Sequence, residues 1–175
     1  IAVMNNTQKG WKNKDFLKHF CHKSHNNSAE YNKIAKFFND YSLPFSVGIA
    51  LLSDQQTLAT IAKDRGPMPS FRDGTFKISN LEKAKETAER LIKLKSFVPN
   101  LVRIVKFSIA FIKISKLDNF NLKTCYAQLE KNSNKFDKCV NQEDWNEAMV
   151  AAYNYKLVTK GKRASKRISI RKEGF

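Results

Sequence analysis

The chain has 175 residues, which suffices for one domain of ordinary size or for two small ones. Its composition, 42% hydrophobic and 27% charged with only 6 Gly and 4 Pro, excludes the disordered and collagen-like classes. Lysine and arginine number 32 against 16 acidic residues, and the net charge of +16 favours polyanions as partners, nucleic acid first and anionic membrane second.

Three helices are expected in the first third of the chain. Apolar spacing within residues 11–25 predicts a short amphipathic helix that begins near Asn13. A second helix is expected over 29–38, with Ser28 as its N-cap. The third, over 45–52, contains no charged side chain, which indicates burial on nearly every side.

The middle of the chain is expected to hold another helical piece, over 54–63, and then a small hairpin. The Gly-Pro-Met-Pro run at 66–69 is the clearest chain breaker and the candidate hinge between two halves. Residues 71–78 are two short apolar/polar alternations joined by Asp73 and Gly74, a pair that suits a type I′ turn. This pattern predicts a β-hairpin.

Helical patterns continue up to residue 157. A Ser-x-x-Glu capping box begins at Ser79 and predicts a helix start. The dense Val, Ile, Phe and Ala content of 101–116 predicts the central core helix, with a strand as the alternative. The expected helices are 79–96, 101–116, one from Asn119 or Asn121 through Glu130, and 143–157 after Asn141.

These elements predict a mainly α fold, a compact bundle of about seven helices with one small β-hairpin near 71–78. Residues 1–66 would form an N-terminal helical half, and 67–158 a second half packed with it as one domain. Residues 159–175 would be a basic tail. The apolar side chains of 45–52 and 101–114 are expected in the core, because burying each stabilises the fold by about 1.5–3 kcal/mol.

The cysteines and the apolar stretches indicate the surroundings of the protein. Cys21, Cys125 and Cys139 are an odd number without a Cys-x-x-Cys pair, which favours a reducing, cytoplasmic location. Charges interrupt the longest apolar stretch, which is shorter than the roughly 20 residues of a spanning helix, so no membrane span is expected. The chain opens on Ile1 without an initiator Met or a leader pattern, so we expect further residues upstream.

Four potential metal ligands, His19, Cys21, His22 and His25, fall within seven residues. His19 and His22 would share one helical face, but the spacing matches no zinc finger or ribbon and the ligand set is incomplete. We therefore expect a polar, basic helix end here, with no bound metal and no cofactor.

Clustered carboxylates are the candidates for acid/base or nuclease chemistry in this sequence. Glu82 and Glu86 lie at i and i+4 among lysines, which is typical of a solvated helix face. Acids at a helix start are favoured by the helix dipole. No nucleophile or histidine accompanies either set, so no catalytic residue is predicted among Glu82, Glu86, Asp137, Glu143, Asp144 and Glu147.

The strongest functional signal is the basic C-terminal tail. Residues 29–52 suggest a helix-turn-helix, but 45–53 lacks Arg, Lys, Asn and Gln and is poorly suited to reading base edges. Long cations of the tail would instead contact phosphates without reading sequence, and six such contacts give a salt slope of about −5. The alternative is a solubilising tail. The predicted nucleic-acid-binding residues are Lys156, Lys160, Lys162, Arg163, Lys166, Arg167, Arg171 and Lys172.

Several fragments, spread over nearly the whole chain, together resemble one family. They are residues 4–11 (MNNTQKGW), Asn27 with Tyr31, 45–52 (FSVGIALL), 71–78 (FRDGTFKI) and 152–155 (AYNY) before a basic end. In order and spacing they resemble the region after the ParB-like (ParB/sulfiredoxin) nuclease-type domain of phage and bacterial proteins. The resemblance implies an upstream domain with an Asp-Gly-x-His-Arg type signature, which this sequence lacks. It implies no catalysis by this part alone.

The sequence therefore predicts a helical, nucleic-acid-binding module of a phage-type ParB-like protein, with DNA favoured over RNA. A second hypothesis is a protein-interaction or oligomerisation module, whose apolar helices pack against a missing N-terminal domain or a second copy. A third is a metal-dependent nuclease. Salt dependence separates the first two, because phosphate binding weakens steeply with salt and apolar association does not.

Overall fold

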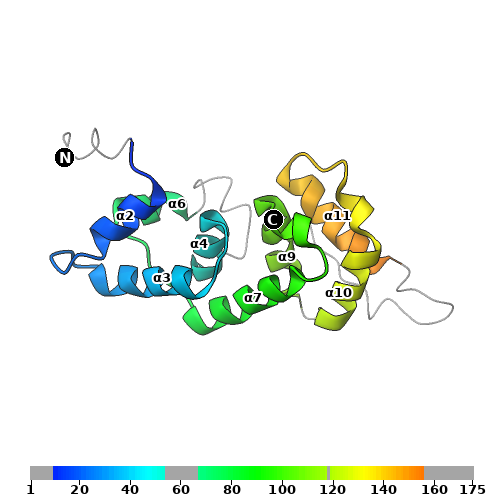
Figure 1. Cartoon of the computed structure of the whole chain (residues 1–175), viewed down its shortest axis with the longest axis horizontal. Coiled ribbons are helices and arrows are strands. Elements are labelled where there is room, and N and C mark those ends of the chain that lie inside the picture. The colour runs from blue at the N-terminus through cyan, green and yellow to red at the C-terminus, as the bar shows by residue number, and fades with distance from the viewer. Residues whose placement is uncertain (1–9, 54–66, 118, 156–175) are drawn as a thin grey trace. The chain divides into compact units, whose positions relative to one another are not determined.

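The structure is a computed structural model that describes residues 10–53, 67–117 and 119–155. Within these ranges the chain forms nine α-helices and one short 3-10 helix and contains no β-strand. The predicted mainly α fold is confirmed, with more helices than the seven expected. The chain divides into two compact units, residues 1–84 and 85–175 (Figure 1). In the same described ranges, no helix has the length and apolar character needed to cross a membrane.

The first unit contains four described helices. They are α2 (Asn13–Phe20), α3 (Ser28–Asp40), α4 (Phe45–Ser53) and α6 (Met68–Asp73). The longest, α3, packs against α2 and α4, while α6 contacts both α2 and α4 (Figure 1). The three predicted N-terminal helices are confirmed, although Asn27 rather than Ser28 is the N-cap of α3. The predicted helical piece at 54–63 lies outside the described residues.

Aromatic side chains fill the core of the first unit. Tyr31 is fully buried and donates a hydrogen bond from its hydroxyl to the carbonyl of Phe71, at 2.6 Å. The two rings stack with centroids 5.4 Å apart. The hydrogen bond satisfies the one polar group of an otherwise apolar side chain, so α3 and α6 are joined without an unpaired buried hydroxyl. Burial also raises the pKa of the Tyr31 hydroxyl.

The prediction of a β-hairpin at 71–78 is wrong. Phe71 and Asp73 belong to α6, and Gly74 ends that helix in the left-handed conformation at φ 86°. The backbone amides of Thr75 and Phe76 both donate to the carbonyl of Ser70, at 3.0 Å each. Glycine with a positive φ occurs both at helix C-termini and in hairpin turns. The Asp-Gly pair alone therefore does not tell a helix end from a hairpin.

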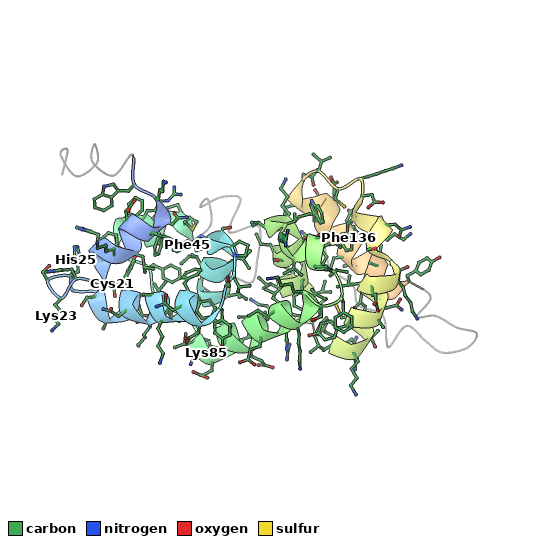
Figure 2. The ribbon with its side chains drawn as sticks, viewed as in Figure 1. Cys21, Lys23, His25, Phe45, Lys85 and Phe136 are labelled. Atoms are coloured by element: carbon green, nitrogen blue, oxygen red, sulfur yellow. The ribbon has the colours of Figure 1, made fainter. Side chains whose placement is uncertain are left out.

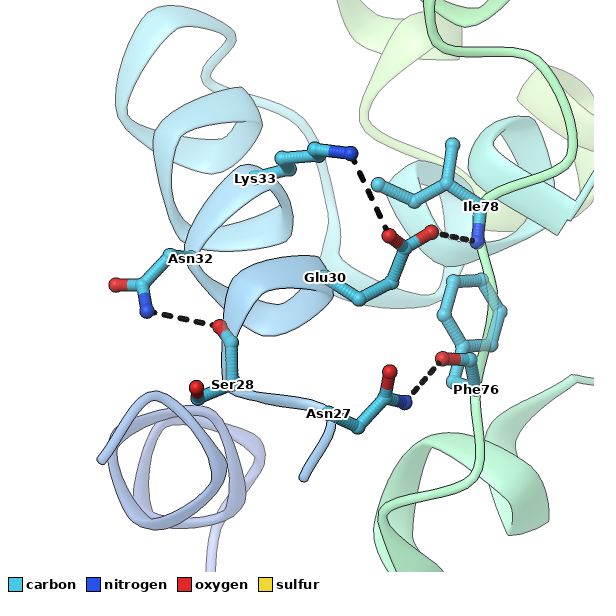
Figure 3. A network of polar contacts seen from close by, with 7 residues as sticks. All are labelled: Asn27, Ser28, Glu30, Asn32, Lys33, Phe76 and Ile78. Atoms are coloured by element: carbon cyan, nitrogen blue, oxygen red, sulfur yellow. Dashed lines mark hydrogen bonds and ion pairs between the residues drawn. The ribbon is translucent and has the colours of Figure 1, made fainter. Parts of the chain in front are cut away.

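The segment after Gly74 is held against α3 by side chains rather than by a partner strand. Asn27 donates its side-chain amide to the carbonyls of Gly74 and Phe76, at 3.1 and 2.9 Å. Glu30 accepts the backbone N–H of Ile78 at 2.7 Å and pairs with Lys33 at 3.6 Å (Figure 3). These contacts satisfy backbone groups that a hairpin would have paired between strands.

The next helix, α7 (Leu81–Leu94), continues from the first unit into the second, since the division lies at Ala84. The side chain of Asn80 accepts the backbone N–H of Lys83 at 3.0 Å, so Asn80 supplies the cap predicted for Ser79. The second unit also contains α8 (Pro99–Val102), α9 (Val105–Ile114), α10 (Leu122–Lys131), the 3-10 helix η1 (Ser133–Phe136) and α11 (Gln142–Asn154).

The core helix predicted at 101–116 is interrupted near its start. Arg103 ends α8 and Ile104 adopts an extended conformation before α9 begins. The buried hydroxyl of Ser108 donates to the carbonyl of Val102 at 3.2 Å and so satisfies one of the helix-end acceptors that the break exposes. The predicted strand alternative is not observed, because both pieces are helical.

The core of the second unit forms where α9 packs against α11 (Figure 1). Trp145 of α11 stacks on Phe136 of η1 with centroids 5.6 Å apart, and the ring of Phe107 in α9 meets both edge-on. The predicted starts of the last two helices are confirmed, since the side chains of Asn121 and Asn141 each accept a backbone N–H at 2.9 Å. α9 is therefore the central apolar helix that the sequence predicts.

Candidate functional site

All eight residues predicted to contact phosphates lie outside the described residues, which end at Tyr155. Their role therefore stays a prediction. They are Lys156, Lys160, Lys162, Arg163, Lys166, Arg167, Arg171 and Lys172.

The helix in the recognition position of the helix-turn-helix pattern is a core element. In α4, Val47, Ile49 and Leu52 are fully buried and Leu51 is nearly so. Phe45 is partly exposed and stacks on Phe38 of α3, with centroids 4.3 Å apart. The expected burial is confirmed for these four residues, whereas Phe45 and Ala50 are only partly buried. α4 carries no Arg, Lys, Asn or Gln, the side chains that make the bidentate contacts with base edges.

Cations on the first unit are exposed around α2 and α3. Lys14 and Lys18 lie on α2, Lys23 lies in the turn that follows, and Lys36 lies on α3. None of these four pairs with an acidic side chain within the described part of the chain. Their charges are therefore available to a polyanion.

The second unit carries a similar set of exposed cations: Lys93, Lys95, Arg103, Lys123, Lys131 and Lys138. Other cations are engaged within the unit. Arg90 forms an ion pair with Glu86, Lys106 donates to the carbonyl of Val140 at 2.5 Å, and Lys135 lies 5.1 Å from the ring centre of Tyr155. Burial lowers the pKa of Lys113 to about 8. Lys113 is therefore a poorer phosphate ligand than the exposed lysines.

Two histidines converge where α2 ends and the chain turns toward α3. The Nε2 atoms of His19 and His25 are 3.1 Å apart, and the ring centroids are separated by 4.6 Å. Trp11 and Phe20 meet the His19 ring edge-on, at 5.1 and 4.9 Å. Partial burial, with the charges of His25 and His22, lowers the pKa of His19. This environment favours the neutral form of the His19 ring over the charged form.

The other two residues of the predicted cluster have different neighbours. His22 is exposed, and its Nδ1 lies 2.7 Å from the hydroxyl of Ser24. Burial raises the pKa of the Cys21 thiol, which opposes formation of the thiolate that binds metals. Figure 2 shows Cys21, Lys23 and His25 at this end of the first unit. No group of three or more His, Cys, Asp or Glu side chains suited to one metal ion occurs among the described residues.

Two of the carboxylates named as catalytic candidates, Asp144 and Glu86, have structural partners. Asp144 accepts the backbone N–H groups of Val140 and Asn141, at 2.9 and 3.0 Å, and these bonds lower the pKa of Asp144. Glu86 pairs with Arg90 along α7. Asp144 thus forms the capping box of α11, as its place in the first helical turn predicts.

The sequence pattern placed the wrong histidines together. His19 and His22 share a face only if the helix continues past them, whereas α2 ends at Phe20. The turn then brings His25 back to His19, six residues away. The exposure of the helical lysines Lys14, Lys18, Lys36, Lys93, Lys123 and Lys131 could be anticipated, because helical spacing places them away from the apolar face.

No protein-family model, curated protein or solved structure matches the chain.

Proposed function

We propose that this chain is a nucleic-acid-binding helical module that contacts phosphates without reading sequence, and that DNA is its principal partner. The observation that carries the proposal is the excess of cations, a net charge of +16. In both units lysines stand exposed without acidic partners among the described residues, as Lys18 and Lys123 do. Such a charge distribution favours the phosphate backbone.

Sequence-independent binding follows from what the helices present. The second helix of the helix-turn-helix segment, α4, is largely buried and carries no Arg, Lys, Asn or Gln. It therefore lacks the side chains that most often hydrogen-bond to base edges. Flexible lysines track backbone charge, which is the same for every sequence. The ParB-like assignment and the cytoplasmic location stay predictions.

The experiment is a fluorescence-anisotropy titration of the full chain with labelled duplexes of unrelated sequence and with RNA of the same length. We expect equal affinities for the duplexes, weaker binding to RNA, and a steep loss of affinity as salt rises. Binding that survives high salt, or that prefers one duplex strongly, would contradict the proposal.

A protein-interaction module is the second candidate, and exposed apolar side chains of the second unit favour it. Ile92, Phe97 and Ile104 are 41%, 38% and 37% exposed, and Val140 is 74% exposed. Self-association through such side chains would persist at high salt, whereas phosphate binding would not. Light scattering of the purified chain across protein and salt concentrations distinguishes the two candidates.

A further inference from the structure

His19 and His25 of the first unit form a close pair whose ring nitrogens face each other. His19 stands in the last turn of α2 and His25 in the turn before α3, so the two rings come from different elements. Their Nε2 atoms face each other at 3.1 Å. Both rings also pack on Phe20, at 4.9 and 5.0 Å, which limits their freedom to turn away.

The separation of the two nitrogens suits one ion held by both. Two imidazole nitrogens bound about 2.0–2.1 Å from a single ion, at angles between about 90° and 109°, are about 2.8–3.4 Å apart. The observed 3.1 Å lies inside this interval. An ion would take the place of the hydrogen that the two nitrogens share, and each ring would then carry its proton on Nδ1.

The chemistry of the donors selects the class of ion. Neutral imidazole prefers the borderline transition metals zinc, nickel and copper over magnesium and calcium, which prefer oxygen ligands. Lys14, Lys18 and Lys23, all exposed nearby in sequence, oppose a cation, but solvent screens charges at the surface.

We propose that His19 and His25 form a two-histidine site for a divalent transition-metal cation such as Zn²⁺ or Ni²⁺. No third protein ligand among the described residues completes the set, so water fills the other coordination positions. Such an open site exchanges its metal readily, unlike the closed four-ligand sites that stabilise small domains. This explains why the spacing of the cluster matches no zinc finger.

The structure supplies a reporter for this site. Trp11 lies 5.1 Å from the ring of His19, and the chain contains just one other tryptophan, Trp145. Ni²⁺ at the pair should quench Trp11 fluorescence, and Zn²⁺ should restore the emission by competition. In the Trp11→Phe variant, which retains Trp145, the quenching should disappear.

The test is a titration of the full, untagged chain with Ni²⁺ alone, followed by Zn²⁺. We expect saturable quenching that is lost in His19→Gln and in His25→Gln. His22→Gln is the matched control, because His22 belongs to the same segment but contacts Ser24, and it should bind Ni²⁺ as the parent does. Circular dichroism of each variant confirms that the helices remain.

Three outcomes would overturn the proposal. They are an absence of saturable quenching in the parent, quenching that survives both substitutions in folded variants, and loss of quenching in His22→Gln. None of them bears on nucleic-acid binding, which the anisotropy titration measures separately.

Discussion

Phe38 of α3 occupies the space that a side chain at Gly48 of α4 would need. A Cβ built at Gly48 would lie 2.3 Å from Cε1 of Phe38, far inside van der Waals contact. The Phe38 ring is itself stacked on Phe45, with planes only 5° apart. The close approach of α3 to α4 therefore depends on a glycine at this position.

Replacing Gly48 with alanine is expected to destabilise the protein. Overpacking costs about 1–3 kcal/mol, whereas alanine in a helix gains about 1 kcal/mol over glycine, so we expect a net loss of about 1 kcal/mol. Urea denaturation followed by circular dichroism measures it. Gly10→Ala is the matched control, because a Cβ there has no neighbour within 4 Å. If the Gly48→Ala variant is as stable as the parent, the Phe38 ring can move away from the added methyl group without loss of stability.

Glu30 is expected to anchor the irregular segment that follows α6. Its carboxylate accepts the N–H of Ile78, and a hydrogen bond to a charged group contributes about 1.5–3 kcal/mol. Glu30→Ala should therefore speed hydrogen exchange at the Ile78 amide. Glu30→Gln retains an acceptor oxygen and should protect this amide better than Glu30→Ala does. Equal exchange rates in the parent and the alanine variant would mean that the segment is held by other contacts.

The stability of the first unit should fall in mild acid because of His19. Burial is the main cause of its lowered pKa, and the charges of His25 and His22 add to it. As pH falls below the ordinary value of 6.5, the unfolded chain takes up a proton before the folded chain does. The free energy of unfolding therefore decreases until the folded pKa is passed.

Denaturant titrations on either side of pH 6.5 test this pH dependence. His19→Gln should show a shallower decrease than the parent, since glutamine does not titrate. A parallel decrease in the two proteins would assign the acid sensitivity to other groups.

The sequence predicted those helices whose starts have a local signal. α10 and α11 begin at Asn121 and Asn141, whose side chains cap them as expected from residue type alone. The break between α8 and α9 has no local signal in the sequence, and the carbonyl that it leaves at Val102 is satisfied by the side chain of Ser108 in the folded core. Local patterns thus located the helices better than their ends.

The wrong prediction of a hairpin and the failure to predict the histidine pair have related causes. The sequence indicates a positive φ at Gly74, but a positive φ suits both a hairpin turn and a helix C-terminus. The contacts of the following segment with Asn27 and Glu30, which favour the helix C-terminus, are visible only in the folded protein. The pairing of His19 with His25 depends on where α2 ends, and helix ends are set by capping and packing rather than by periodicity. The predicted burial of α4, in contrast, required only its composition.

The basic tail gives the most direct test of nucleic-acid binding. Ending the chain after Leu157 removes seven cations and one acid. We expect affinity for every duplex to fall by a similar factor, because the lost contacts are to phosphates. Thermal melting of the shortened chain shows whether the helices keep their stability, and a large drop would mean that the tail is part of the fold.

The measurement is the slope of log affinity against log salt for one DNA duplex, with the full chain and with the chain ending at Leu157. If six tail cations contact phosphates, the slope of the full chain should be steeper by about 5. If the two chains show equal slopes and equal affinities, the tail does not contact phosphates. If the full chain shows no salt-dependent binding to the duplex, the proposed function is contradicted.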